Sequence, residues 1–404
     1  MQKATRQHTK EHNRNLVLKT IFDHESISRA EIARITSLTR TTVSDIVSDL
    51  LTVKLVSEIG VGSSLGGKNP ILLSLVEDSR YLIGVDLAYN QFSGAVVNLR
   101  GRIRHMITKP VNIRNTDETL TVVYEILDQL METPYHPIIG IGVGTPGLVD
   151  TSEGVVINAV NLDWKNLPLA HLLKERYHLP VYILNDSQAA AIGEFTYSVG
   201  HISDSNLIVI NVRQGIGAGI VINGQLFQGD GGAAGEIGHI VVVPEGGTLC
   251  RCGNYGCLET VASTQAIIKQ AQWQASQTPS TQFSQLSPKI DLDAIELAFN
   301  AGDPLARQVV LEAGRYLGLA ISNLVGTLNI HKILLSGVMT CFGEPWLEAI
   351  RGSMVHTTLA KLAQDTRVEI GQLGENGIIL GASALLANDY SLLFSQQLPR
   401  DQVL

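Results

Sequence analysis

One short part of this chain reads Glu236-Ile237-Gly238-His239 and, after ten intervening residues, Cys250-Arg251-Cys252-Gly253-Asn254-Tyr255-Gly256-Cys257-Leu258-Glu259. The spacing His-x10-Cys-x-Cys-x4-Cys supplies one imidazole and three thiolates, which is the ligand set of a closed tetrahedral zinc site. We therefore predict a structural Zn²⁺ ion that clamps this loop. Its predicted ligands are His239, Cys250, Cys252 and Cys257.

The alternative for these cysteines is a disulfide or a chance loop among glycines. The chain has only four cysteines and begins without an apolar signal segment, which predicts a cytoplasmic protein. Because disulfides are rare in that compartment, clustered Cys and His residues there more often bind metal. Cys341 stands apart from the cluster, and we expect it to be an ordinary buried thiol.

Two carboxylates, Glu236 and Glu259, flank the predicted zinc ligands. The clamped loop is predicted to aim both of them at a polyhydroxylated ligand. His239 can bind zinc through one ring nitrogen and donate a hydrogen bond from the other. The segment therefore predicts a ligand site as well as a metal site.

Length and charge indicate several packed units and an appended basic segment. A chain of 404 residues is long enough for two or three units, and no stretch approaches the apolar length of a membrane span. The net charge of −8 argues against indiscriminate coating of nucleic acid, yet residues 1–21 carry five basic residues against Glu11 alone. This uneven charge predicts that the N-terminal part of the chain binds an anionic partner.

That module is predicted to be a winged helix-turn-helix. Apolar residues recur at helical spacing from Leu16 to Phe22, and Ser28 with Glu31 forms a capping box for a second helix. Thr39 is predicted to cap a third helix whose opposite face begins with Arg40. This is the layout of a recognition helix that enters the major groove, although a three-helix scaffold with a polar surface would share it.

The segment after the third helix favours DNA binding. Two predicted strands, near 55–59 and 71–75, flank a glycine-rich tip that ends in Lys68. Such a hairpin is typical of a wing. We predict that Arg40 and Lys68 contact phosphates or bases of double-stranded DNA.

Beyond residue 80 the pattern changes to strands that alternate with helices, which predicts an α/β architecture with a ligand crevice between lobes. Asn185 and Asp186 lie where an apolar strand ends and a helix begins. Asp186 could accept hydrogen bonds from sugar hydroxyls, could act as the catalytic base of a kinase, or could only cap the helix. Asn161 lies in a polar loop that suits a sugar. Gly215, Gly217 and Gly219 fit either a phosphate-cradling turn or a tight hairpin.

Together these motifs resemble the ROK family of repressors, open reading frames and kinases, over nearly the whole chain. The specific parts are the segments 236–239 and 250–259, joined by Gly144-Thr145-Pro146-Gly147 and Leu184-Asn185-Asp186. Within that family the chain is most similar to the sugar-responsive repressors. The resemblance implies an N-terminal winged helix, two actin-like (ribonuclease-H-like) α/β lobes and a zinc-clamped loop beside a sugar in the cleft.

The resemblance also implies partners and contact residues. A monosaccharide effector of the xylose, glucose or N-acetylglucosamine class would contact Asn161, Asn185, Asp186, Glu236, His239 and Glu259. Operator DNA would contact Arg29, Thr39, Arg40, Thr41, Thr42, Ser44 and Lys68. A homodimer or homotetramer would place recognition helices on operator half-sites.

One departure separates the chain from the family's kinases, which carry Asp-x-Gly-Gly-Thr after their first strand. Here the run is Asp86-Leu87-Ala88-Tyr89-Asn90, and a second phosphate segment, Gly-Thr-Gly in kinases, reads Arg213-Gln214-Gly215. The nucleotide site is thus predicted to be eroded, which favours a repressor without enzyme activity. A sugar kinase with an appended DNA-binding domain, and a constitutive DNA-binding protein with a vestigial cleft, are the alternatives.

We expect a DNA-binding domain over residues 1–77 and a first lobe over 78–200, onto which a helix at about 375–390 packs back. A second lobe over 201–374 would hold the zinc site and an oligomer interface, and residues 391–404 would form a tail.

Overall fold

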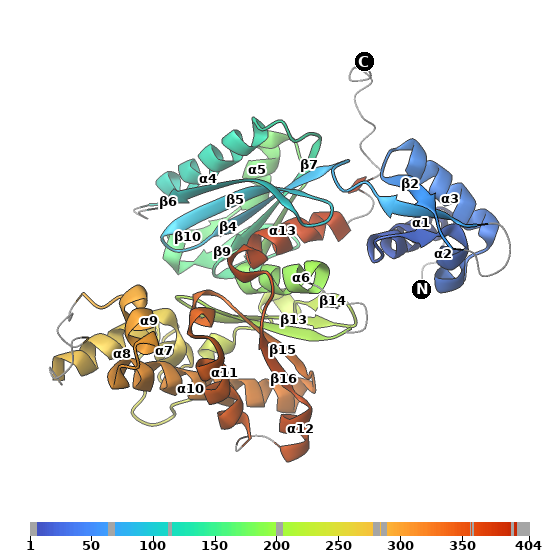
Figure 1. The fold of residues 1–404 in the computed structure, drawn as a ribbon. Helices are drawn as coiled ribbons and strands as arrows, with labels where there is room; N and C mark the ends of the chain where they lie inside the picture. Colours follow the sequence, from blue (N-terminus) through green and yellow to red (C-terminus); the bar gives the residue numbers. More distant parts are fainter. Residues whose placement is uncertain are drawn as a thin grey trace.

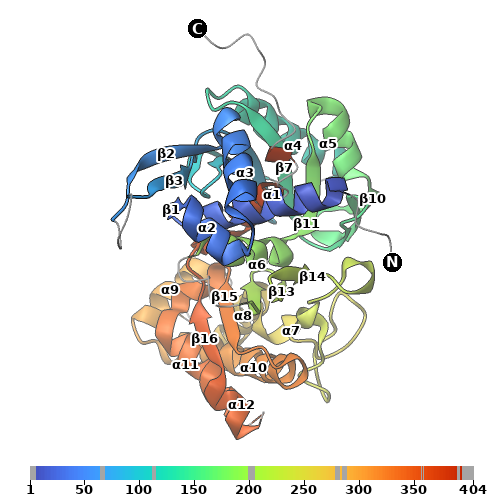
Figure 2. The same ribbon diagram turned by 90° about the vertical axis from the view of Figure 1, so that its right-hand side faces the viewer.

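The computed structural model describes residues 6–63, 69–111, 115–198, 205–277, 283, 289–355, 357, 359–388 and 392–393. Figures 1 and 2 show an N-terminal module beside the upper of two α/β lobes, with the second lobe below it. No helix in these ranges is long and apolar enough to cross a membrane.

The N-terminal module is a bundle of helices closed by a small sheet in the order β1-β3-β2. As predicted, Ser28 and Glu31 form a capping box before the second helix, and Thr39 accepts from the backbone N–H of Thr42 at the start of the third. The first helix begins before the predicted apolar stretch, at Arg6. The elements are α1 (Arg6–Phe22), β1 (Ile27–Ser28), α2 (Arg29–Thr36), α3 (Arg40–Thr52), β2 (Val56–Val61) and β3 (Ile71–Leu75).

The first lobe is built on a five-stranded sheet in the order β11-β7-β4-β5-β6. Strands β4, β7 and β11 run parallel, whereas β5 and β6 pair antiparallel. A smaller sheet, β10-β9-β8, lies at the cleft end. The elements are β4 (Tyr81–Leu87), β5 (Gln91–Asn98), β6 (Ile103–Pro110), α4 (Thr116–Met131), β7 (Ile138–Thr145), β8 (Leu148–Asp150), β9 (Val155–Ala159), η1 (Val160–Leu162), β10 (Trp164–Leu167), α5 (Leu169–Tyr177) and β11 (Val181–Asn185).

The second lobe repeats this topology in the order β14-β13-β12-β15-β16, with the same two antiparallel and two parallel pairings around its first strand. This duplication confirms the predicted α/β lobes. The elements are β12 (Leu207–Val212), β13 (Ile216–Ile222), β14 (Gln225–Phe227), η3 (Asp230–Gly232), η4 (Ile237–His239), α7 (Glu259–Ala262), α8 (Thr264–Gln277), α9 (Leu292–Asn300), α10 (Pro304–Leu328), β15 (Lys332–Ser336), η6 (Val338–Phe342), α11 (Gly343–Met354), α12 (Ala360–Asp365), β16 (Arg367–Ile370) and η7 (Gly374–Asn376).

Two helices, α6 (Asp186–Tyr197) and α13 (Gly377–Asn388), pack on each other between the lobes (Figure 1). α13 covers strands β4 and β7 of the first lobe, as predicted, while α6 covers β12 and β13 of the second. Their backbones approach closely, since a Cβ atom built on Gly381 would lie 1.7 Å from the carbonyl oxygen of Ala189. The lobes therefore meet through a helix pair that leaves little room for sliding.

The N-terminal module is fixed to the first lobe by apolar contacts and by arginines that cap its helices. Leu82 and Ile139 of the first lobe share a buried core cluster with Val43 and Leu50 of α3. The fully buried Arg80 donates from Nη2 to the carbonyl of Val53, just after α3, over 3.1 Å. Because carbonyls at a helix end lack partners within the helix, such bonds hold α3 in a defined place on the lobe.

Two expectations about the second lobe were wrong. The Gln-, Ser- and Thr-rich composition of residues 272–287 predicts a solvated loop, but residues 272–277 belong to α8, since Ala271 and Ala275 pack into the core at helical spacing. Cys341 is exposed rather than buried, because it lies in the 3-10 helix η6 with Met339 and Phe342 turned inward.

Candidate functional site

A polar cavity of about 840 Å³ lies in the cleft between the lobes. Its walls come from the β4–β5 and β7–β8 turns of the first lobe and from the β12–β13 turn and the cysteine loop of the second. The structure brings all of the predicted sugar-binding residues into this cavity: Asn161, Asn185, Asp186, Glu236, His239 and Glu259. Residues distant in sequence thus share one space of a size that admits a small polar ligand.

The predicted metal ligands form a compact cluster at the cavity edge. The ligand atoms of His239, Cys250, Cys252 and Cys257 all lie within 4.8 Å of one another, and the four cysteines of the chain are free. The Sγ atoms of Cys252 and Cys257 are 3.6 Å apart, and Nδ1 of His239 is 3.6 Å from Sγ of Cys250. Sulfur ligands about 2.3 Å from a tetrahedral zinc ion lie about 3.8 Å apart, so the cluster fits such an ion.

A metal bound here would have to deprotonate the clustered thiols. Burial and the neighbouring thiols raise the pKa of Cys257 to about 12 when no ion is bound. Metal binding requires thiolates, and a divalent cation supplies the charge that stabilises them. The cluster can therefore hold a metal and would clamp the loop from η4 to α7.

His239 connects the cluster to the cavity. Its Nδ1 faces Cys250, while its Nε2 lies 3.8 Å from Oε2 of Glu236. Partial desolvation in the cleft raises the pKa of Glu236, and the nearby Glu259 acts in the same direction, whereas His239 opposes it. Nδ1 of His239 therefore faces the cysteine cluster, whereas Nε2 faces Glu236 and the cavity.

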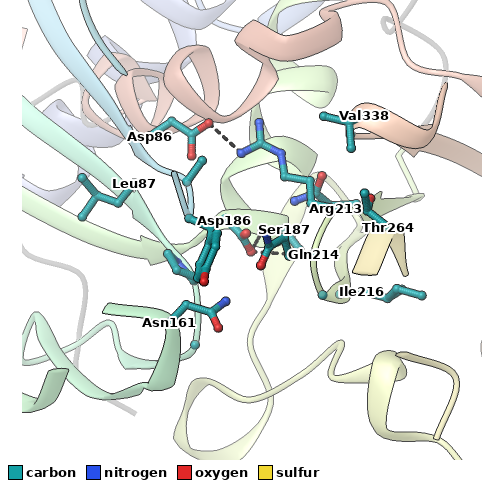
Figure 3. Close-up of a pocket in the computed structure, with 18 of the residues that line it drawn as sticks. Asp86, Leu87, Asn161, Asp186, Ser187, Arg213, Gln214, Ile216, Thr264 and Val338 are labelled. Carbon is teal, nitrogen blue, oxygen red and sulfur yellow. Dashed lines mark hydrogen bonds and ion pairs between the residues drawn. The ribbon is translucent and has the colours of Figure 1, made fainter. Parts of the chain in front are cut away.

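Asp186 stands at the N-terminus of α6, where Figure 3 shows it beside Ser187. Its Oδ1 accepts from the backbone N–H of Ser187 over 2.7 Å. Burial raises its pKa to about 6, against the opposing effect of the Arg213 guanidinium. Asn185 caps the helix with Oδ1 and donates from Nδ2 to the carbonyl of Gly147 over 2.9 Å. The amide of Asn185 therefore has a structural role in addition to any ligand contact.

The predicted nucleotide region contains an ion pair that crosses the cleft. Nη1 of Arg213, at the end of β12, lies 2.8 Å from Oδ2 of Asp86, at the end of β4, and both side chains are largely buried (Figure 3). Leu87, beside Asp86, is fully buried. The glycines after Arg213 belong to the tight β12–β13 hairpin, with Gly215 in its turn and Gly217 and Gly219 in β13. Arg213 thus connects the end of β12 to the end of β4 across the cleft.

Sequence reasoning missed Arg251, which lies between two of the cysteines. Its Nε and Nη2 bind the two carboxylate oxygens of Glu259 over 2.8 and 2.9 Å. Its Nη1 donates to Oδ1 of Asn161, on the opposite lobe, over 2.7 Å. No spacing rule marks a residue inside a cysteine motif, and the partner Asn161 is 90 residues away, so the contact required the three-dimensional structure.

The predicted DNA-binding residues lie in two places. Thr39, Arg40 and Thr41 are exposed at the start of α3, with Thr42 and Ser44 partly exposed behind them. Arg29 instead pairs with Glu58 of β2 over 2.9 Å, which supports the module internally. Lys68 lies outside the described residues.

The helix that carries Asp186 reaches the N-terminal module at its other end. Tyr197, the last residue of α6, has its ring centroid 6.5 Å from that of Phe22, the last residue of α1. Arg100, on the turn between β5 and β6, stacks on Phe22 and donates to the carbonyls of Phe22 and His24. One helix thus connects the cavity to the module.

This fold defines the class of the protein: two duplicated α/β lobes of the actin-like type, closed over a polar cleft and joined to a helical module. The chain belongs to the ROK family, whose sequence profile matches residues 82–389. It is 31% identical to the xylose repressor of Caldicellulosiruptor bescii over 389 residues, which cover 94% of this chain and 96% of that protein.

Solved structures support the same assignment. The crystal structure of a ROK family transcriptional regulator, a homologue of the Escherichia coli MLC protein, is similar with a TM-score of 0.84, 28% identity and coverage of 96% of this chain and 98% of that one. A ROK family glucokinase from Streptomyces griseus, in complex with glucose and AMPPNP, has a TM-score of 0.68, 30% identity and coverage of 76% and 98%. The match to the regulator extends over a larger share of this chain than the match to the kinase.

Proposed function

We propose that this protein is a sugar-responsive transcriptional repressor, released from its operator DNA by a monosaccharide. The observation that carries the proposal is that one helix, α6, has Asp186 in the cavity at one end and Tyr197 against the helical module at the other. The similarity to a xylose repressor over 94% of the chain supports it. In this proposal residues 1–77 form the DNA-binding domain, and 78–200 and 201–374 form the two lobes. Leu393, which the sequence placed in a tail, packs instead into the core cluster of the N-terminal module.

In the cleft, sugar hydroxyls would donate to the carboxylates of Asp186, Glu236 and Glu259, because ionised carboxylates are strong acceptors. Asn161 and Asn185 would contribute amide groups, and His239 would donate from Nε2. A zinc ion on His239 and the three clustered cysteines would hold the loop that carries these groups. The ion supplies structural rigidity, and the chain's own side chains bind the sugar. The effector would be of the xylose, glucose or N-acetylglucosamine class.

The Arg213–Asp86 ion pair supports a regulator rather than a kinase. The pair occupies the part of the cleft where a kinase must leave its backbone open to nucleotide phosphates. Removing one partner of such a buried pair leaves an uncompensated charge, so the pair is not readily displaced. Asp186, although retained, would then accept a sugar hydroxyl without transferring a proton to complete a phosphorylation.

DNA binding would use the exposed start of α3. Thr39, Arg40 and Thr41, with Thr42 and Ser44, would face the major groove, and Arg40 would contact a phosphate or a base edge. Lys68 would contact the backbone from the wing, while Arg29 would position the module through Glu58. A homodimer or homotetramer would bring two such helices to the half-sites of a palindromic operator.

The deciding experiment is fluorescence anisotropy with purified protein and the DNA upstream of its own gene, at constant salt. We expect one of xylose, glucose and N-acetylglucosamine to weaken binding by about 5- to 150-fold, the usual range of allosteric coupling. An Arg40→Ala variant should lose operator affinity with or without sugar. DNA binding that no sugar changes would contradict the effector assignment, and ATP turnover with any of the sugars would favour the kinase.

Sugar affinity should depend on pH through Asp186. Its pKa is raised to about 6 by burial, so at pH 5 most molecules carry a neutral carboxyl that is a poorer acceptor for a sugar hydroxyl. Affinity measured by calorimetry should therefore rise about tenfold between pH 5 and pH 7 and then level off. An Asp186→Asn variant should bind weakly at every pH, and a wild-type affinity that does not change over this interval would exclude Asp186 as the titrating contact.

The same pKa shift has the opposite consequence for folding. Because the folded-state pKa of Asp186 is raised above its ordinary value of 3.8, ionising this group costs stability in the native state. Its unfavourable contribution is absent below about pH 4 and grows until about pH 6. As the pH rises from about 4 to 6, ionisation of Asp186 should therefore lower the stability of the fold and raise the affinity for sugar.

A further inference from the structure

We propose that Arg251 is a built-in competitor of the sugar, a latch that ties the two lobes through the sugar's own ligands until the sugar displaces it. This inference rests on the proposed function and adds to it how the same site is regulated. The guanidinium binds both oxygens of Glu259 and the amide oxygen of Asn161, which are two of the proposed sugar contacts.

The contacts of Arg251 use the acceptors that a sugar would need. Glu259 is nearly buried, with its side chain 11% exposed, and each of its oxygens faces one nitrogen of Arg251 at 2.8 or 2.9 Å. Two hydroxyls on neighbouring sugar carbons present a similar pair of donors to a carboxylate. A planar guanidinium fork and such a diol therefore compete for the same two oxygens.

The rest of the site is shaped around this guanidinium. Gly215, on the β12–β13 turn, lies so close that a Cβ atom there would be 3.0 Å from Nη2 of Arg251 and 2.7 Å from Oε2 of Glu259. Arg251 also lies between Cys250 and Cys252, so a metal bound to these cysteines would fix its backbone. The guanidinium of Arg251 is consequently held next to the oxygens of Glu259 and Asn161 that accept from it.

The latch also joins the lobes. Asn161 belongs to η1 of the first lobe, whereas Arg251 and Glu259 belong to the second. The side chain of Arg251 is 38% exposed, so water and a ligand can reach it, unlike the deeper Arg213–Asp86 pair. An entering sugar would thus break one cross-cleft connection and replace it with its own contacts to both lobes, which changes how the lobes are held together.

The test compares sugar affinity of the zinc-loaded, full-length wild type with that of Arg251→Ala by calorimetry at pH 7, using xylose, glucose and N-acetylglucosamine. Loss of one competing charge-assisted contact should tighten binding by about tenfold. Operator release should then occur at about tenfold lower sugar concentration. Arg251→Lys, which keeps the charge but loses the fork, should lie between the two.

Controls separate the latch from the proposed function. Zinc content must be equal in all variants, and Arg315→Ala, which removes an exposed arginine on α10, should bind sugar like the wild type. If wild type and Arg251→Ala both fail to bind any of the sugars, the proposed sugar site is wrong. If the wild type binds and Arg251→Ala binds equally or more weakly, the sugar site stands, while the latch is overturned, because Arg251 is then neutral or a sugar ligand itself.

Discussion

Replacement of Cys257 by serine is expected to abolish binding of the proposed zinc ion and release by sugar, while operator binding persists. Cys257 is fully buried, faces Cys252 and pairs in a β-bridge with Val241, so it anchors the C-terminal end of the cysteine loop next to α7. Three ligands bind zinc far less tightly than four, because the binding free energy of a structural ion, about 10–16 kcal/mol in small domains, is shared among its ligands. Without the ion, Glu236, His239 and Glu259 lose their fixed positions.

The N-terminal module should survive this change. Its core, which includes Val17, Ile32 and Leu50, shares no residue with the metal loop. We expect metal analysis to show loss of zinc, calorimetry to show at least a hundredfold loss of sugar affinity, equivalent to about 2.7 kcal/mol, and anisotropy to show operator affinity within threefold of wild type. Cys341→Ser, at the exposed thiol outside the cluster, is the matched control. A zinc-free protein with an unaltered sugar response would exclude this role for the metal.

Local features of the fold could be predicted from the sequence because their determinants lie within a few residues. The capping box of Ser28 and Glu31 and the cap at Thr39 depend on side chains three residues from the groups that they bond. The cysteine cluster has its ligands on one loop, so their spacing was informative. The small residues of α13 correctly indicated a helix that packs on the first lobe.

Contacts between distant segments could not be predicted in the same way. Arg213 and Asp86 are separated by 127 residues, and only the folded lobes bring them to one end of the cleft. The sequence did show that Arg213 and the residues after Asp86 depart from the kinase pattern, but it did not show that Arg213 pairs with Asp86. Nothing in the sequence indicated a role for Arg251, since its contact with Asn161 exists only when the two lobes are folded against each other.

Repression requires a connection between sugar and DNA, and α6 is the element that spans the distance. Its first residue, Asp186, is in the cavity, and its close packing on α13 restrains it from bending. A shift of the helix on sugar binding would therefore be passed to Tyr197. There the ring lies on the turn of Gly101, where a Cβ atom would be 2.6 Å from Cδ1 of Tyr197, and next to Phe22.

Tyr197→Leu is consequently expected to uncouple the two activities. Leucine fills part of the space of the ring but cannot reach Phe22 and the turn that carries Arg100, so movement of α6 would no longer be transmitted to α1. Sugar affinity and sugar-free operator affinity should each stay within threefold of wild type. Their coupling, about 1–3 kcal/mol in a typical allosteric protein, should fall to nearly zero.

The measurement is operator anisotropy at zero and at saturating sugar, repeated for Tyr197→Phe, which keeps the aromatic contact and should respond like the wild type. Phe22→Leu removes the other half of the contact and should resemble Tyr197→Leu, and the double variant should add nothing further, since both changes break the same connection. Full release by sugar in a folded Tyr197→Leu protein would show that the signal reaches the DNA-binding module by another route. The apolar contacts of Leu82 and Ile139 with that module would then be the next segment of the first lobe to test.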